Sequence, residues 1–163
     1  MKRLTLALAL AAGTASAQDS AFVAFRVLTP ELAMQAAVAA MENCRDAGYQ
    51  VGVTVVDRFG LPQAFVRDRL AGLHVYETSR RKAWTAVSFR APTGELAAST
   101  EAGQISSGIR HLTEALPLGG GLPIGAGDGD MVAGIGVSGA PSPELDEICA
   151  EAGIAAIADE IAF

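Results

Sequence analysis

The sequence predicts an α+β fold in which an antiparallel sheet is flanked by helices. Short β-branched segments occur in pairs that are joined by tight turns, at Asp57–Gly60 and at Asp128–Asp130. Two longer, alanine-rich segments open with the same helix start signal, Thr29-Pro30-Glu31 and Ser142-Pro143-Glu144. Because strands joined by short connections pair antiparallel, a parallel βαβ arrangement is the less favoured alternative.

Residues 1–17 have the three parts of a secretory signal peptide. Lys2-Arg3 gives a positive start, Leu4–Ala12 is an apolar run, and Ala15-Ser16-Ala17 matches an Ala-x-Ala cleavage site. A membrane anchor is less favoured because the run is shorter than the roughly 20 apolar residues that a span needs. We therefore predict cleavage at the end of that motif, a periplasmic or secreted protein, and one mature domain over residues 18–163.

The charge balance excludes some partners. The whole chain carries 12 Lys and Arg against 18 Asp and Glu, which gives a formal charge of −6. Loss of Lys2 and Arg3 with the signal peptide leaves 10 basic residues against the same 18 acids, so the charge becomes −8. Such an acidic chain is poorly suited to nucleic acid, whose binding depends on neutralising phosphates, and to a polybasic membrane contact.

The first helix and strand pair are well marked. A helix is expected over residues 30–47, with Thr29 as its N-cap and Gly48 as its C-terminal stop. Residues 49–56 are mostly apolar and β-branched, which predicts a strand buried on nearly both faces. Residues 63–67 return as the second strand of a hairpin.

The middle of the chain is less regular. After a loop over residues 68–73, a helix is expected from about His74 to Phe89, and Thr93 starts a short helix. Residues 102–116 have a weak pattern that predicts a mixture of loop and short helix.

The C-terminal third predicts a second strand pair and a last helix. Residues 117–124 contain several glycines and prolines, which make a poor central strand. Residues 131–137 predict a strong strand whose alternating glycines admit a neighbouring backbone. The last helix opens at Ser142 and is expected to end near Ile161.

The two cysteines, Cys44 and Cys149, each fall in a predicted helix. In an oxidising compartment they could form a disulfide, but only if those helices pack side by side. Two buried free thiols are an equally good interpretation. No metal-binding spacing such as CxxC is present.

Two glycine-containing motifs do not meet the requirements of familiar enzyme sites. Gly119-Gly120-Gly121 lacks the GxGxxG spacing of a dinucleotide site and does not run into a helix. Ser138 lies in Gly136-Val137-Ser138-Gly139-Ala140, which is not the GxSxG elbow of a serine hydrolase.

His74 is the leading candidate for a ligand-binding residue. It is one of two histidines and stands where a loop becomes a helix, near Arg67, Arg69 and the run Arg80-Arg81-Lys82. An imidazole among cations and apolar side chains suits an anionic, largely apolar ligand that needs one axial donor, and haem is such a ligand. Arginine forks suit the haem propionates. The alternative is that His74 only caps or packs the start of the helix.

Helix geometry limits what the basic run can do. Adjacent helical residues point in different directions, so Arg80, Arg81 and Lys82 cannot all serve one site, and at least one is expected to be solvated. Arg81 lies two turns from His74 on the same face. Other candidate iron donors or pocket walls, each more commonly a surface or core residue, are His111, Tyr76, Met41 and Met131.

Several stretches match a known family in order and spacing. They are Val53–Asp57 with Gly60, Arg67-Asp68, Ala71–His74, Ser79–Ala86, Gly119–Ile124, Gly134–Ala140, and Asp146-Glu147 with Cys149-Ala150. Together they resemble the GlcG/HbpS family of haem-binding proteins, which is related to the C-terminal domain of the PduO type. The resemblance covers about residues 29–160. It departs at residues 68–72, where many relatives have an Asp-Gly-Ala run.

The resemblance implies a profilin-like fold, haem (heme b) as the cofactor, frequent oligomers, and a binding or sensing role more than catalysis. It carries over His74 as the iron ligand, with Arg67 and Arg80 as weaker candidates. Tyr76, a candidate from the residues alone, completes the set of predicted cofactor-binding residues. Our main hypothesis is an exported, homo-oligomeric haem-binding protein that serves sequestration, transport or sensing.

The sequence is also compatible with two alternatives. The same cleft could belong to an enzyme or cofactor protein that acts on a small organic acid or a corrinoid, with His74 moving a proton. The alanine-rich helices could instead build an assembly with a structural or signalling role.

Overall fold

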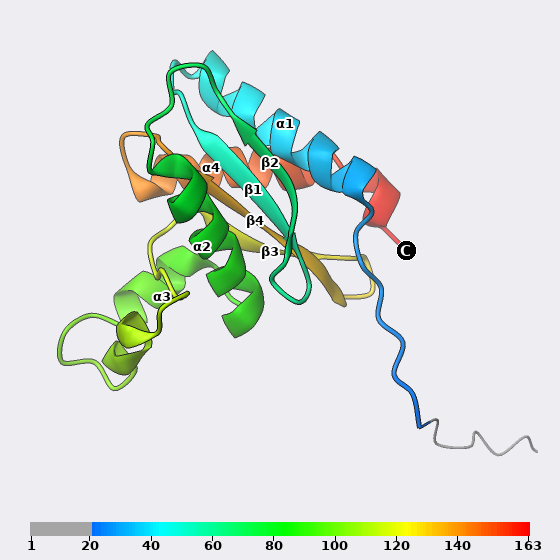
Figure 1. The fold of residues 1–163 in the computed structure, drawn as a ribbon. Coiled ribbons are helices and arrows are strands. Elements are labelled where there is room, and N and C mark those ends of the chain that lie inside the picture. The colour runs from blue at the N-terminus through cyan, green and yellow to red at the C-terminus, as the bar shows by residue number, and fades with distance from the viewer. Residues whose placement is uncertain (1–20) are drawn as a thin grey trace, which may run out of the picture.

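The computed structural model describes residues 21–163 (Figure 1). The elements in chain order are α1 (Pro30–Asp46), β1 (Gly52–Asp57), β2 (Pro62–Arg67), α2 (Val75–Phe89), α3 (Thr93–Ser99), a 3-10 turn (Ser107–His111), β3 (Gly121–Gly125), β4 (Met131–Ser138), α4 (Pro143–Ala155) and a 3-10 turn (Asp159–Ile161). The predicted signal peptide and its cleavage site lie outside the described residues. Within residues 21–163, no helix has the length and apolarity needed to cross a membrane.

The four strands form one antiparallel sheet in the order β2-β1-β4-β3. The predicted α+β class with an antiparallel sheet is therefore confirmed. Strand β3, which contains Pro123, lies at the edge of the sheet. This position is expected because proline has no backbone N–H to donate to a second neighbouring strand. Strand β1 starts at Gly52, although the sequence predicted a start at Tyr49. The Tyr49 N–H donates to the Cys44 carbonyl in the last turn of α1, so this residue still belongs to the end of the helix.

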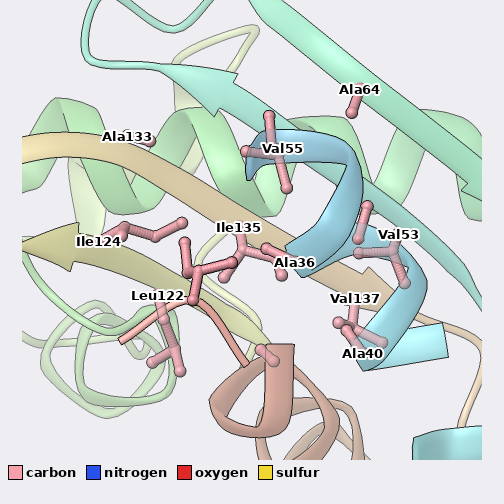
Figure 2. Close-up of a cluster of buried hydrophobic side chains, with 14 of the residues drawn as sticks. Ala36, Ala40, Val53, Val55, Ala64, Leu122, Ile124, Ala133, Ile135 and Val137 are labelled. Atoms are coloured by element: carbon pink, nitrogen blue, oxygen red, sulfur yellow. The ribbon is translucent and has the colours of Figure 1, made fainter. Parts of the chain in front are cut away.

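Helices α1 and α4 cover one face of the sheet and α2 covers the other (Figure 1). The main core lies under α1 and α4, where alternate residues of the central strands point. Figure 2 shows Ala36 and Ala40 of α1 close to these side chains, which are Val53, Val55, Ile135 and Val137. Small residues on the helix let it lie close to the sheet.

The opposite face of β4 is made of small residues because α2 lies almost on the strand. A Cβ atom at Gly134 would lie 2.5 Å from Cγ1 of Val87, and one at Gly136 would overlap the carbonyl oxygen of Ser79. The prediction that these alternating glycines admit a neighbouring backbone is confirmed. The close approach also positions the N-terminal half of α2 beside the end of β4.

Cys44 and Cys149 form a disulfide that joins α1 to α4, with the two Cα atoms 5.5 Å apart. The two helices pack side by side, which was the condition for the pairing. The choice left open by the sequence is thus resolved in favour of a disulfide.

The last helix ends at Ala155, so the predicted end near Ile161 is wrong. Hydrogen bonds from Ile157 to Ile154 and from Ala158 to Ala155 tighten the chain into an i→i−3 pattern. The tighter turn buries Ile157 completely and lets the Ile161 carbonyl accept the Gly127 N–H. Tertiary contacts here override the helical tendency of the alanines.

Helix α2 is capped at its C-terminal end by Arg90, which adopts a left-handed conformation with φ 54° and ψ 41°. It is the only non-glycine residue with a positive φ among residues 21–163. Its N–H donates to the Ala86 carbonyl, which closes the helix. Glycine usually occupies this position, and a side chain there costs about 1–2 kcal/mol.

Candidate ligand-binding groove

A groove of about 390 Å³ opens between the N-terminal half of α2, the β4–α4 loop and the start of α4. His74, Thr78 and Lys82 line it from α2. Because they are spaced by four residues, these three side chains share one face of the helix. Ser138 lines it from the end of β4 and Asp146 from α4. In Figure 1 this is the place where the orange β4–α4 loop approaches the start of α2.

His74 occupies the N-cap position of α2, and its side chain is exposed. The imidazole is folded over Gly72, so that a Cβ atom added there would lie 2.7 Å from Cε1 and 2.8 Å from Nδ1. Neither ring nitrogen makes a hydrogen bond to a residue in the described part of the chain. The imidazole is therefore available to a ligand at the mouth of the groove.

The loop that precedes His74 is held by two arginines. Asp68 is buried and accepts two hydrogen bonds from Arg45, of 2.8 and 3.1 Å. The Arg45 hydrogen bond holds the pKa of Asp68 below its ordinary value. Arg67 donates to the Ala71 carbonyl from Nε and Nη2, at 3.0 and 2.6 Å. These contacts fix the backbone of the β2–α2 loop at Asp68 and at Ala71, and so fix the path of the chain into His74.

A buried ion pair forms the floor of the groove. The ammonium of Lys82 lies 2.7 Å from Oδ2 of Asp146, and the two side chains are 1% and 6% exposed. Lys82 also donates to the Val137 carbonyl at 2.9 Å. The second carboxylate oxygen of Asp146 accepts the Ala140 N–H at 2.9 Å. The pair therefore ties α2 to β4 and holds the β4–α4 loop, which is one wall of the groove.

Burial dominates the electrostatics of this pair. It lowers the pKa of Lys82 and raises the pKa of Asp146, although the mutual attraction and hydrogen bond of the two groups oppose both shifts. Taking a charge out of water costs free energy unless a partner compensates for it. The charged form of each group in this buried position therefore depends on the presence of the other.

The glycine triplet has a structural role at this floor. Gly120 has φ 107°, and a Cβ atom there would lie 2.6 Å from Cβ of Asp146 and 3.0 Å from Nζ of Lys82. Only a residue without a side chain leaves room for the ion pair. The glycine triplet, which does not match a dinucleotide-binding motif, is thus explained by the packing at Gly120.

Of the four predicted site residues, only His74 lines this groove. Tyr76 packs edge-on against Phe65, with the ring centroids 4.8 Å apart. Arg80 pairs with Glu114 at 2.7 Å and with Glu77 at 3.1 Å. Arg67 is engaged with the β2–α2 loop. Ligand contacts by Arg67, Tyr76 and Arg80 stay predictions.

The other candidate iron donors lie elsewhere. His111 ends the 3-10 turn and is exposed, which agrees with its interpretation as a surface residue. Met41 packs against the main core, and Met131 packs with Val56 in the smaller core cluster. Among residues 21–163, no group of three or more His, Cys, Asp or Glu side chains is arranged to hold a metal ion.

Sequence reasoning missed Lys82, Asp146, Thr78 and Ser138 as groove residues. The signal for Lys82 was its spacing of two four-residue steps from His74, which puts it on the same face as Thr78. The hydroxyls of Thr78 and Ser138 are 2.7 Å apart and bridge α2 to β4. That contact depends on how the helix crosses the sheet, which the sequence pattern does not specify.

The family described as haem degrading protein HbpS-like matches residues 28–155. The chain belongs to this family. The match spans every strand of the sheet, and it contains His74, Lys82 and Asp146. The GlcG/HbpS resemblance predicted from the motifs is therefore confirmed.

Two solved structures show the same fold. A doubly substituted variant of Streptomyces reticuli HbpS is 42% identical and has a TM-score of 0.78, covering 89% of this chain and 97% of that chain. The PduOC structure, which is a haem complex, is 33% identical with a TM-score of 0.75, covering 80% of this chain and 95% of that one.

Among curated proteins, the corrinoid adenosyltransferase PduO of Salmonella typhimurium is 35% identical over 121 residues. The match covers 73% of the HbpS-like chain but only 35% of PduO. The chain therefore spans about a third of that relative's length.

Proposed function

We propose that this HbpS-like protein binds haem at the groove between α2 and the β4–α4 loop, with His74 as the iron ligand. The observation that carries the proposal is the exposed His74 imidazole, whose ring nitrogens have no partner among the described residues. Family membership and the haem complex of the PduOC relative support the choice of ligand. Sequestration, transport and sensing are the roles that we expect.

The residues at the groove fit a haem. Haem supplies an iron that accepts a neutral imidazole nitrogen, and His74 offers one at the mouth. Leu118 lines the groove. Leu73, the residue before His74, is 93% exposed and adds apolar surface next to the imidazole. Cofactor sites of this kind are mostly apolar with a few polar anchors.

A larger hollow of about 470 Å³ is a poorer candidate. It lies along α4 and is lined by Glu144, Glu147 and Glu151. Three carboxylates would repel the propionates of haem, and no described histidine lines the hollow. The smaller groove is the better candidate for haem because it offers a histidine and has fewer carboxylates in its lining.

The predicted roles of the arginines require rearrangement. Arg67 would have to leave the Ala71 carbonyl to bind a propionate, and Arg80 would have to give up Glu114. Since the Arg80 pairs are part-exposed, their loss would be inexpensive. Propionate binding by either arginine is part of the proposal.

The central test is a titration of haemin into the wild type and into His74→Ala. We expect the variant to bind haemin about tenfold more weakly or worse, with a shifted Soret band, because the iron loses its nitrogen ligand. An unchanged Soret band and affinity would remove His74 from the ligand role.

Two further variants sharpen this test. His111→Ala removes the other histidine, which is exposed on the 3-10 turn, and should bind haemin like the wild type. Gly72→Ala keeps His74 but forces its ring away from the added methyl group, so an intermediate affinity is expected. A parallel titration with hydroxocobalamin tests the corrinoid alternative, since preferential binding of the corrinoid would contradict a haem protein.

We also propose that the protein is exported. The segment over residues 1–17 supports this, and so does the disulfide, because such bonds persist in oxidising compartments. Expression with the native N-terminus should give a periplasmic or secreted chain that starts at Gln18 by mass spectrometry. Recovery of the uncleaved chain in the cytoplasm would contradict export.

A further inference from the structure

Another cavity lies at the opposite end of α2 from His74. It has a volume of about 290 Å³ and forms where the end of α2 meets the β1–β2 turn and the β3–β4 hairpin. Arg58 and Arg90 line it together with Asp130, Pro123 and Met131. Two arginines that line one small cavity point to an anionic ligand, because the planar fork of arginine matches a carboxylate.

Arg58 is the better shielded of the two arginines. Its side chain is only 9% exposed, and its guanidinium carbon lies 4.4 Å from the centre of the Phe25 ring. Nη1 donates to the two oxygens of Asp130 at 3.0 and 3.3 Å, and to the Arg26 carbonyl at 3.4 Å. No described residue accepts a hydrogen bond from Nε or Nη2. The Arg58 guanidinium is held by several contacts and still has N–H donors that a ligand could use.

Arg90 is the unusual member. Its guanidinium makes no hydrogen bond or ion pair within the described part of the chain. Its backbone is left-handed, at a helix end where glycine or asparagine is the usual residue. A side chain that persists in a disfavoured conformation suggests a function for that side chain. Here the side chain lines a cavity that already holds a second arginine.

We propose that this cavity binds a small organic acid through its single carboxylate, which Arg90 and Arg58 receive. Asp130 lies at the same cavity and would repel a second carboxylate or a phosphate dianion. Pro123 and Met131 offer apolar contact to a short aliphatic chain. The site therefore takes a short-chain monocarboxylate.

This site is separate from the proposed haem groove. Helix α2 has 15 residues, so at 1.5 Å per residue its two ends are about 22 Å apart. None of the residues that line one cavity lines the other. The carboxylate site can therefore exist whether or not the protein binds haem, and the two proposals fail independently.

Butyrate is the probe for the test, followed by NMR of the arginine Nε–H and backbone amide signals. In the wild type we expect saturable shifts at Arg90, Arg58 and Met131. Arg90→Gly removes the guanidinium while placing the preferred residue at the helix end, so it should fold and lose butyrate affinity about tenfold or more. Arg90→Lys keeps the charge without the fork and should bind with intermediate affinity.

A matched control removes an arginine elsewhere. Arg69→Ala changes the net charge equally, and its side chain is exposed on the β2–α2 loop, so butyrate affinity should not change. Haemin affinity should be unaltered in Arg90→Gly. Absence of saturable shifts in the wild type, or equal binding by Arg90→Gly, would overturn the site. Tighter binding of inorganic phosphate than of butyrate would overturn the monocarboxylate assignment.

Discussion

Asp146→Ala is expected to lower the free energy of unfolding by about 3–5 kcal/mol, because it leaves a buried ammonium without its counter-charge. Lys82 is 1% exposed and lies 2.7 Å from the Asp146 carboxylate. Its remaining hydrogen bond goes to the Val137 carbonyl, which carries no full charge. The variant also frees the Ala140 N–H and so loosens the wall of the groove. Urea denaturation at neutral pH measures the loss.

Two controls separate charge from packing. Combining Lys82→Met with Asp146→Leu removes both charges, and it should recover most of the stability that Asp146→Ala loses. Raising the pH should also reduce the deficit of Asp146→Ala. Burial already holds the pKa of Lys82 below its ordinary value in the folded protein, and loss of the carboxylate lowers it further. Above that lowered pKa the folded state holds a neutral amine while the unfolded state still binds a proton, so stability rises with pH.

The prediction has a clear contrary outcome. A loss below about 1 kcal/mol would mean that water reaches the ammonium, since unpaired charges are tolerated only when solvated. A deficit that does not change with pH would mean that the lost side-chain packing, and not the charge, carries the effect. Asp146→Asn removes the same charge but keeps the shape of the side chain, so a similar loss of stability in this variant would assign the effect to the charge.

The arrangement of the sheet could be predicted because local patterns and tertiary contacts agree. In β4, Ile135 and Val137 face α1 and α4, while Gly134 and Gly136 face α2. An alternation of large and small residues therefore marks both faces of a central strand. The end of the last helix was missed because the burial of Ile157 depends on contacts distant in sequence.

The groove could be predicted only in part. His74 was found because an isolated histidine at a helix start is conspicuous in a sequence with two histidines. The partner of Lys82 lies 64 residues away, and no periodicity links the two. Likewise, the engagement of Arg80 with Glu114 is set by the path of an irregular segment over residues 102–116. Charge clusters in a sequence do not reveal which members are already neutralised.

Replacing both cysteines, by Cys44→Ala with Cys149→Ala, is expected to cost about 4–5 kcal/mol of stability and roughly 10–20 °C in Tm. The bridge spans 105 residues, most of the described chain, so it restricts the unfolded state strongly. In the folded state it holds α1 against α4 beneath the sheet, where Cys44 and Cys149 are buried among alanines. Thermal unfolding of the oxidised wild type and of the double variant gives the difference.

Reduction of the wild type provides the matched comparison, because it opens the bridge without changing any side-chain volume. A reductant should lower the Tm of the wild type toward that of the double variant and leave the double variant unaffected. Equal Tm values for oxidised and reduced wild type would contradict a stabilising bridge. Because α1 and α4 lie on the face opposite α2, His74 and the groove should keep their geometry below the lowered Tm. Haemin affinity at low temperature should then be the same with and without the bridge, whereas a joint loss would mean that the two faces of the sheet are coupled.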